Sequence, residues 1–172
     1  PTIDARLGDL RGAAFGRPWR GRARAALADG RLDVHELVLA TGDTAFQAQG
    51  RFAEEWHVDW QLQAIDLSEP LAELLPGVSG AAEASGTLVG PRSALHAETT
   101  LHARNLAWDD HRTAGLTLTA AADFDAEPKD DTSLVDGIVE SLRWQSELLG
   151  EDVSSGDVEF GQVTLRTGGS LA

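Results

Sequence analysis

Apolar and polar side chains alternate along much of this chain, most clearly between residues 56 and 64. The apolar set is Trp56, Val58, Trp60, Leu62 and Ala64, and the residues between them are His57, Asp59, Gln61 and Gln63. Because successive side chains of a β-strand point to opposite faces, this pattern predicts a strand with one apolar face and one solvated face. Two tryptophans on the apolar face require a cover, which is either another protein layer or a ligand.

The same period of two recurs in segments 19–28, 31–40, 93–103 and 112–124. Between the first two lies Asp29-Gly30, a pair typical of the two-residue hairpin turn in which both residues need a positive φ. Within 31–40 the apolar positions slip by one residue between Val34 and Leu37, which predicts a β-bulge. A tight connection is expected at 109–111. Consecutive strands joined by short turns predict an all-β fold.

Only residues 68–75 show a helical pattern, with leucines at helical spacing and Pro76-Gly77 as its end. A strand punctuated by glycines is expected over 77–90. The acidic, proline-containing stretch 125–136 predicts an exposed loop. Residues 138–149 fit a strand and a helix equally, so the pattern does not decide between them.

Composition and charge narrow the function classes. The 172 residues carry 14 Lys and Arg and 28 Asp and Glu, a formal net charge of −14, which argues against binding the phosphate backbone of nucleic acids. Cysteine is absent, which excludes disulfides and thiolate metal sites, and no apolar run reaches the roughly 18 residues that span a bilayer. Because the chain begins at Pro1 and contains no Met, we expect a piece of a longer protein whose membrane anchor lies outside it.

No group of side chains points to catalysis. His96, Glu98 and His102 share one face of a predicted strand, but they span about 20 Å of it, whereas the ligands of one zinc ion lie about 2 Å from the metal. The sequence contains no G-x-S-x-G turn and no phosphate-binding glycine loop. We therefore expect no catalytic residue, no metal site and no cofactor, and we predict that the protein is not an enzyme.

Residues 60–91, WQLQAIDLSEPLAELLPGVSGAAEASGTLVGP, combine a strand, a short Leu-rich helix ending in LLPG and a strand running into SGTL-x-GP. This order resembles the repeating signature of TamB and the related AsmA-like periplasmic proteins. Strands of the same character continue over most of residues 19–172. The resemblance implies an all-β fold, a U-shaped curved β-sheet groove with one short helix around 68–75.

The resemblance also implies a setting. Such proteins extend through the periplasm of diderm bacteria from an N-terminal inner-membrane anchor and are implicated in phospholipid transport to the outer membrane and in outer-membrane protein assembly. TamB-like members work with an outer-membrane β-barrel partner of the TamA type. The family has no catalytic residues to transfer. A weak internal similarity, LVLATGDT at 37–44 and VTLRTGGS at 163–170, suggests one repeat unit over about 19–125 and the start of the next over 138–172.

We hypothesise that the apolar strand faces shield the acyl chains of phospholipids. The faces of 93–103 and 112–124 are rich in Ala and Thr, and such small side chains leave space that a close-packed interior would fill. Each CH₂ group of a lipid buried there contributes about 0.8 kcal/mol. The residues expected to line the groove share strand parity: Trp56, Val58, Trp60, Leu62, Leu95, Leu101, Leu116 and Leu118.

Three alternatives stay open on the sequence alone. In the first, a second sheet covers the tryptophans and closes a β-sandwich. In the second, exposed strand edges capture unfolded outer-membrane proteins by β-augmentation, as a chaperone would. In the third, the chain is a secreted adhesion or carbohydrate-binding module, with Trp19 or Trp108 as a stacking platform.

Overall fold

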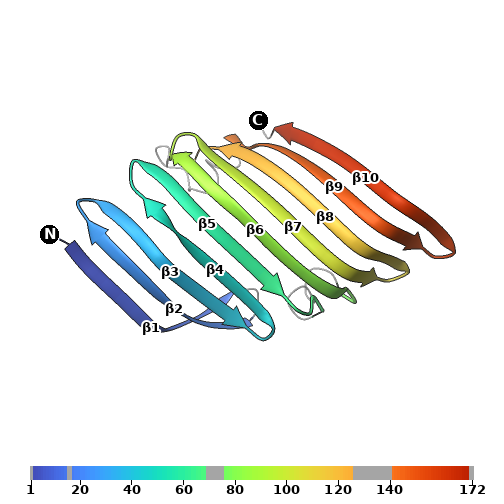
Figure 1. Ribbon diagram of the computed structural model, residues 1–172, viewed down its shortest axis with the longest axis horizontal. Helices are drawn as coiled ribbons and strands as arrows, with labels where there is room; N and C mark the ends of the chain where they lie inside the picture. The colour runs from blue at the N-terminus through green and yellow to red at the C-terminus, as the bar shows by residue number, and fades with distance from the viewer. Residues whose placement is uncertain (1, 15–16, 69–75, 126–140, 171–172) are drawn as a thin grey trace.

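The computed structural model describes residues 2–14, 17–68, 76–125 and 141–170. These residues form one ten-stranded antiparallel sheet in chain order, with β1 and β10 at opposite edges (Figure 1). The strands are β1 (Thr2–Ala14), β2 (Arg17–Ala28), β3 (Arg31–Thr41), β4 (Thr44–Phe52), β5 (Glu55–Ala64), β6 (Ser79–Pro91), β7 (Leu95–Trp108), β8 (His111–Phe124), β9 (Arg143–Ser155) and β10 (Val158–Ser170). Each strand pairs with the next one along the chain, and the sheet does not close on itself.

Short turns fix the register of several hairpins. Asp29 and Gly30 have φ angles of 50° and 76°, the two positive values that the predicted hairpin turn requires. The turn after Trp108 pairs that residue with His111, and its first residue, Asp109, also has a positive φ of 51°. Asp and Gly tolerate this backbone region better than most residues. Both predicted connections are therefore confirmed.

The predicted β-bulge in β3 is also confirmed. The pairing of β3 with β2 and with β4 shifts in the interval between Val34 and Leu37. In both cases β3 has one residue more than its neighbour, and against β2 that residue is His35. Because the bulge accommodates the extra residue, Leu37 stays on the face that carries Val34, and a bulge also increases the local twist.

A single layer of strands leaves only a small core. Leu95 is the one large side chain that is fully buried among the described residues. A small cluster of Ala64, Leu67 and Val78 lies at the two ends of the connection between β5 and β6. The total accessible surface is 11447 Å², against about 8,100 Å² for a compact globular protein of this mass. The excess agrees with a sheet whose two faces have no second layer among the described residues.

The all-β prediction is confirmed, and an open ten-stranded sheet fits the expected curved groove. The described residues contain no second sheet over the tryptophans of β5, so the β-sandwich alternative is wrong for that part of the chain. Most of the predicted helix at 68–75 and of the predicted loop at 125–136 lies outside the described residues. The ambiguous stretch 138–149 contributes its end to β9.

The two similar octapeptides have different conformations. Residues 37–44 end β3, turn and begin β4, whereas residues 163–170 lie within β10. The proposed repeat boundaries at 19–125 and 138–172 stay a prediction.

Candidate functional site

One row of apolar residues crosses the whole sheet. Cross-strand partners lie on the same face, about 5 Å apart, so the strand register identifies the residues of each row. From β1 to β10 the central row reads Leu10, Gly21, Leu39, Phe46, Leu62, Ala84, Leu101, Leu118, Leu148 and Leu165. Ten strands at a spacing of about 4.8 Å make this row about 43 Å long.

The two rows beside it toward Trp56 are also uncharged. The first reads Leu7, Ala23, Leu37, Ala48, Trp60, Gly86, Thr99, Ala120, Ser146 and Thr167, and the second reads Ala5, Ala25, Val34, Gly50, Val58, Leu88, Ala97, Ala122, Trp144 and Gly169. We call the face that carries these three rows the apolar face, and the opposite side the polar face. The alternation seen within single strands thus adds up to one uncharged surface.

Large side chains of the apolar face lie close over glycines of neighbouring strands. A Cβ atom on Gly86 would come within 2.7 Å of the Trp60 ring, and one on Gly169 within 3.3 Å of Trp144 Nε1. The Trp60 ring also stacks with Phe46 of β4, at a centroid distance of 6.5 Å. The absence of a side chain at each of these glycines therefore leaves room for the aromatic ring on the neighbouring strand.

The apolar face is open to solvent, most strongly near the sheet edges. Side chains in its middle are half-buried by their neighbours, whereas Leu7 in β1 is 53% exposed and Leu165 in β10 is 54% exposed. Described residues supply no second layer over it. A contiguous exposed apolar surface on a protein is typical of a site that receives another apolar molecule.

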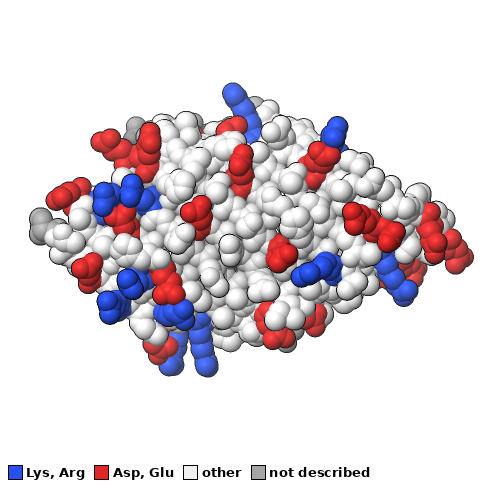
Figure 2. Space-filling view, viewed as in Figure 1, with Lys and Arg blue, Asp and Glu red and all other residues white. Residues whose placement is uncertain are grey.

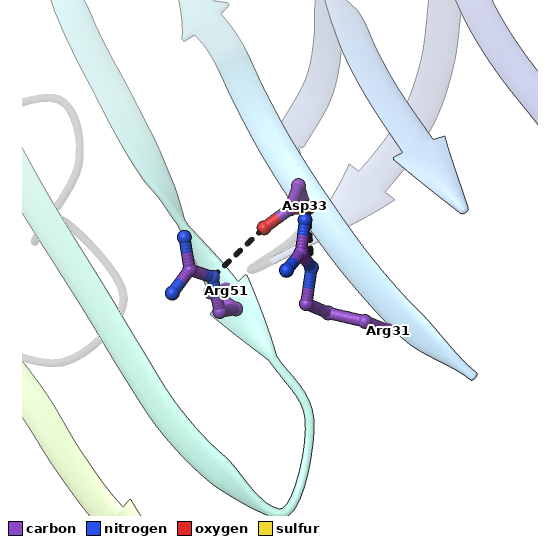
Figure 3. A network of polar contacts seen from close by, with 3 residues as sticks. All are labelled: Arg31, Asp33 and Arg51. Atoms are coloured by element: carbon purple, nitrogen blue, oxygen red, sulfur yellow. Dashed lines mark hydrogen bonds and ion pairs between the residues drawn. The ribbon is translucent and has the colours of Figure 1, made fainter. Parts of the chain in front are cut away.

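The polar face carries the ion pairs. Arg22 Nη2 lies 2.7 Å from Glu36 Oε1. The carboxylate of Asp33 accepts hydrogen bonds from Arg31 Nε at 2.8 Å and Arg51 Nε at 3.0 Å (Figure 3), and the bond from Arg51 is the main cause of a lowered pKa of Asp33. Exposed pairs of this kind contribute little to stability, because solvent screens them. The pairs do identify the polar face of the sheet.

The histidines of β7 have separate partners on this face. His96 Nδ1 lies 2.7 Å from Asp123, and the ring's Nε2 lies 3.4 Å from Glu98. These carboxylates, Asp123 before Glu98, raise the pKa of His96. His102 Nδ1 lies 3.1 Å from Thr117 Oγ1 instead. The described part of the chain contains no group of three or more such side chains arranged to hold a metal ion.

Hollows on the polar face are lined mostly by polar side chains. One of about 610 Å³ is bordered by five strands, β3 to β7, and its lining includes Glu36, Gln47, Gln61 and Thr100. Another of about 550 Å³ surrounds the Asp33 network. The face shown in Figure 2 has charged side chains dispersed among uncharged ones, with acidic groups gathered at the tip of the β9–β10 hairpin. Such hollows suit water, so the candidate lipid surface is the apolar face.

The structure brings the eight predicted lining residues to the apolar face. Four of them occupy alternate positions of β5, and the other four lie on β7 and β8, where Leu101 pairs with Leu118. Leu95 is only 1% exposed, so it contributes packing and not accessible surface. The role of the eight residues in holding lipid stays a prediction.

Sequence reasoning missed several members of the central row. Phe46 lies on β4, where Phe46, Ala48 and Gly50 alternate with Gln47 and Gln49, and this period of two was the available signal. The others are Leu10, Leu39, Ala84, Leu148 and Leu165.

Comparison with known proteins places this sheet in a family. The family model described as "TamB, N-terminal domain" matches residues 7–153, which is most of the 172 residues. Neither the curated proteins nor the solved structures contain a match. None of the described residues forms a helix with the length and hydropathy that a membrane span needs. The family match agrees with the open all-β sheet, and the chain belongs to the TamB family.

Proposed function

We propose that this chain is a non-enzymatic section of a periplasmic lipid path, in which the apolar face shields phospholipid acyl chains between the inner and outer membranes. The observation that carries the proposal is the uncharged central row across all ten strands. A charged residue in the row would oppose the passage of hydrocarbon, because a charge at the centre of a bilayer costs about 3 kcal/mol or more.

The dimensions of the apolar face suit an acyl chain. A bilayer's hydrocarbon core is about 30 Å thick, so the tail in one leaflet extends about 15 Å. The central row, at about 43 Å, is longer than one tail. Each CH₂ group that leaves water contributes about 0.8 kcal/mol regardless of where along the row it lies. Diffuse contact of this kind holds a tail without fixing it, which is what sliding requires.

Family membership supports this setting. TamB proteins are periplasmic, are anchored in the inner membrane and act as transport or assembly components without enzymatic activity. We therefore expect the intact protein to work beside an outer-membrane β-barrel partner of the TamA type. The phospholipid and that partner are the two contacts that the proposal requires.

Photo-crosslinking in the intact protein tests the proposal. Leu101 and Leu118 are cross-strand partners on the apolar face, and the adjacent residues His102 and Thr117 are partners on the polar face. Photoreactive residues at Leu101 and Leu118 should capture phospholipid, and those at His102 and Thr117 should not. Because the two pairs lie on the same two strands, equal capture by both pairs would rule out the assignment.

The second candidate, a chaperone that works by β-augmentation, is favoured by the edges of the sheet. The edge strands β1 and β10 are each 13 residues long, and no other described strand pairs with their outer sides, where the backbone groups of an unfolded strand could pair. This function predicts binding of unfolded barrel peptides that survives replacement of Leu101 and Leu118 by Asn. Loss of peptide binding in that variant would favour the apolar face instead.

A further inference from the structure

Arg92 reaches over the end of the apolar face. It lies in the tight connection between β6 and β7, where Ala94 N donates a hydrogen bond to Pro91 O at 2.9 Å. Its guanidinium carbon lies 5.3 Å from the ring centroid of Trp56. Trp56 is the residue that begins the apolar alternation of β5 and lies opposite Gly90. A cation therefore sits at the rim of a surface whose three rows carry no charge.

The Trp56 ring is itself held in place. Phe52, its cross-strand partner on β4, meets it edge-on, with centroids 5.0 Å apart and planes at 74°. A guanidinium over a tryptophan face is attracted by the negative face of the ring. This contact uses the flat face of the guanidinium and leaves its N–H groups, which lie in the plane, free to donate.

Those N–H groups have no acceptor among the described residues, because Trp56 is the one partner of Arg92 in that part of the chain. The arginines of the polar face differ. Arg22 and Arg51 each donate to a carboxylate on the same face. Arg92 is thus a preoriented cation with unused donors, and planar guanidinium groups of this kind suit the oxygens of a phosphate.

We propose that Arg92 and Trp56 form a headgroup site, in which the guanidinium binds the phosphate of a phospholipid whose tail lies along β5. From Trp56 to Leu62 a strand rises about 20 Å, against the roughly 15 Å that a tail extends in one leaflet. The apolar face beyond Trp56 is therefore long enough for the tail. This inference rests on the proposed function and adds selectivity for phospholipids over lipids without a phosphate.

Competition between two lipids tests the site in the intact protein. A photoreactive residue at Leu101 is exposed to vesicles that contain equal amounts of labelled phosphatidylglycerol and labelled diacylglycerol. Wild-type protein should capture mainly the phospholipid. In Arg92→Gln the captured ratio should fall about tenfold, as expected for the loss of one hydrogen-bonded charge, while diacylglycerol capture stays unchanged. Arg92→Lys should restore only part of the preference, because lysine keeps the charge without the planar fork.

Arg112→Gln is the matched control. Arg112 is an exposed arginine of β8 paired with Ala107, at the opposite ends of the strands, and its loss should leave the ratio unchanged. Urea unfolding of each variant confirms that the sheet is intact. An unchanged ratio in Arg92→Gln, or an equal fall in Arg112→Gln, would overturn the headgroup site and leave the lipid path standing. Failure of the wild-type protein to capture either lipid at Leu101 would instead contradict the proposed function.

Discussion

Gly86 of β6 lies opposite Trp60 of the neighbouring strand β5. Because glycine has no side chain, it leaves room for the indole ring. A Cβ atom there would clash with the carbonyl oxygen of Glu98 and would lie 2.7 Å from the Trp60 ring. The same principle applies at Gly21, where an added Cβ would meet Leu39 Cδ2 at 2.7 Å. Small residues of the apolar face are therefore part of how its large residues are packed.

Replacing Gly86 by Ala should destabilise the sheet. The added methyl group has to displace either an indole ring or a neighbouring strand, and overpacking of this kind costs about 1–3 kcal/mol. Urea denaturation followed by tryptophan fluorescence should show a lower midpoint. The control is Gly161→Ala in β10, where nothing lies within 4 Å of the added Cβ. The free energy of unfolding of this control should stay within about 0.5 kcal/mol of the wild-type value. A similar loss of stability in both variants would refute the packing argument.

At the scale of the element, β3 shows how a β-bulge accommodates one inserted residue without changing a face of the sheet. Both neighbouring strands are regular at the point where β3 carries its extra residue. Without His35, Leu32, Val34, Leu37 and Leu39 would alternate with a strict period of two. The apolar face therefore does not depend on the bulge, which changes the local twist instead.

Deleting His35 should leave the sheet folded. The shortened β3 can pair in register with β2 and β4, so unfolding free energy should change by about 1 kcal/mol or less, as judged by circular dichroism and urea titration. Deleting Asp59 from the regular strand β5 is the control, because it moves Trp60, Leu62 and Ala64 onto the polar face. That variant should lose the folded sheet. Comparable damage in the two deletions would show that the bulge is required for folding.

Periodicity within single strands predicted β5, β7, β8 and their apolar faces, because one buried face imposes alternation on the sequence. It could not predict how those strands align, since register depends on the connection. A two-residue turn such as Asp29-Gly30 fixes the register of the two strands that it joins. The connection between β5 and β6 is longer, covering residues 65–78, so the sequence does not determine the register of these two strands. The central row is a property of register, so the sequence alone could not predict it, although three of its seven leucines, Leu62, Leu101 and Leu118, were expected on apolar faces.

At the scale of the whole molecule, the proposed lipid path would follow an unbroken row, so every strand along the row would be equally important for lipid passage. A lipid tail that moves across ten strands contacts each strand in turn. A charged residue on the apolar face of any one strand should therefore slow lipid transfer. A static binding site would respond only to changes within it. The two ends of the apolar face offer a test of this difference, because Leu7 and Leu165 lie on opposite edge strands and are both more than half exposed.

Leu7→Glu and Leu165→Glu should therefore each slow the transfer of labelled phospholipid from the inner to the outer membrane in cells that depend on this protein. A carboxylate in contact with hydrocarbon costs about 3 kcal/mol, which corresponds to more than a hundredfold in occupancy, while the exposure of both sites keeps the cost to folding small. Thr164→Glu adds the same charge on the polar face, where Thr164 pairs with Leu149, and should leave transfer unchanged. Inhibition by only one of the two edge variants would indicate a local binding site, because a path in series has to be sensitive at both ends.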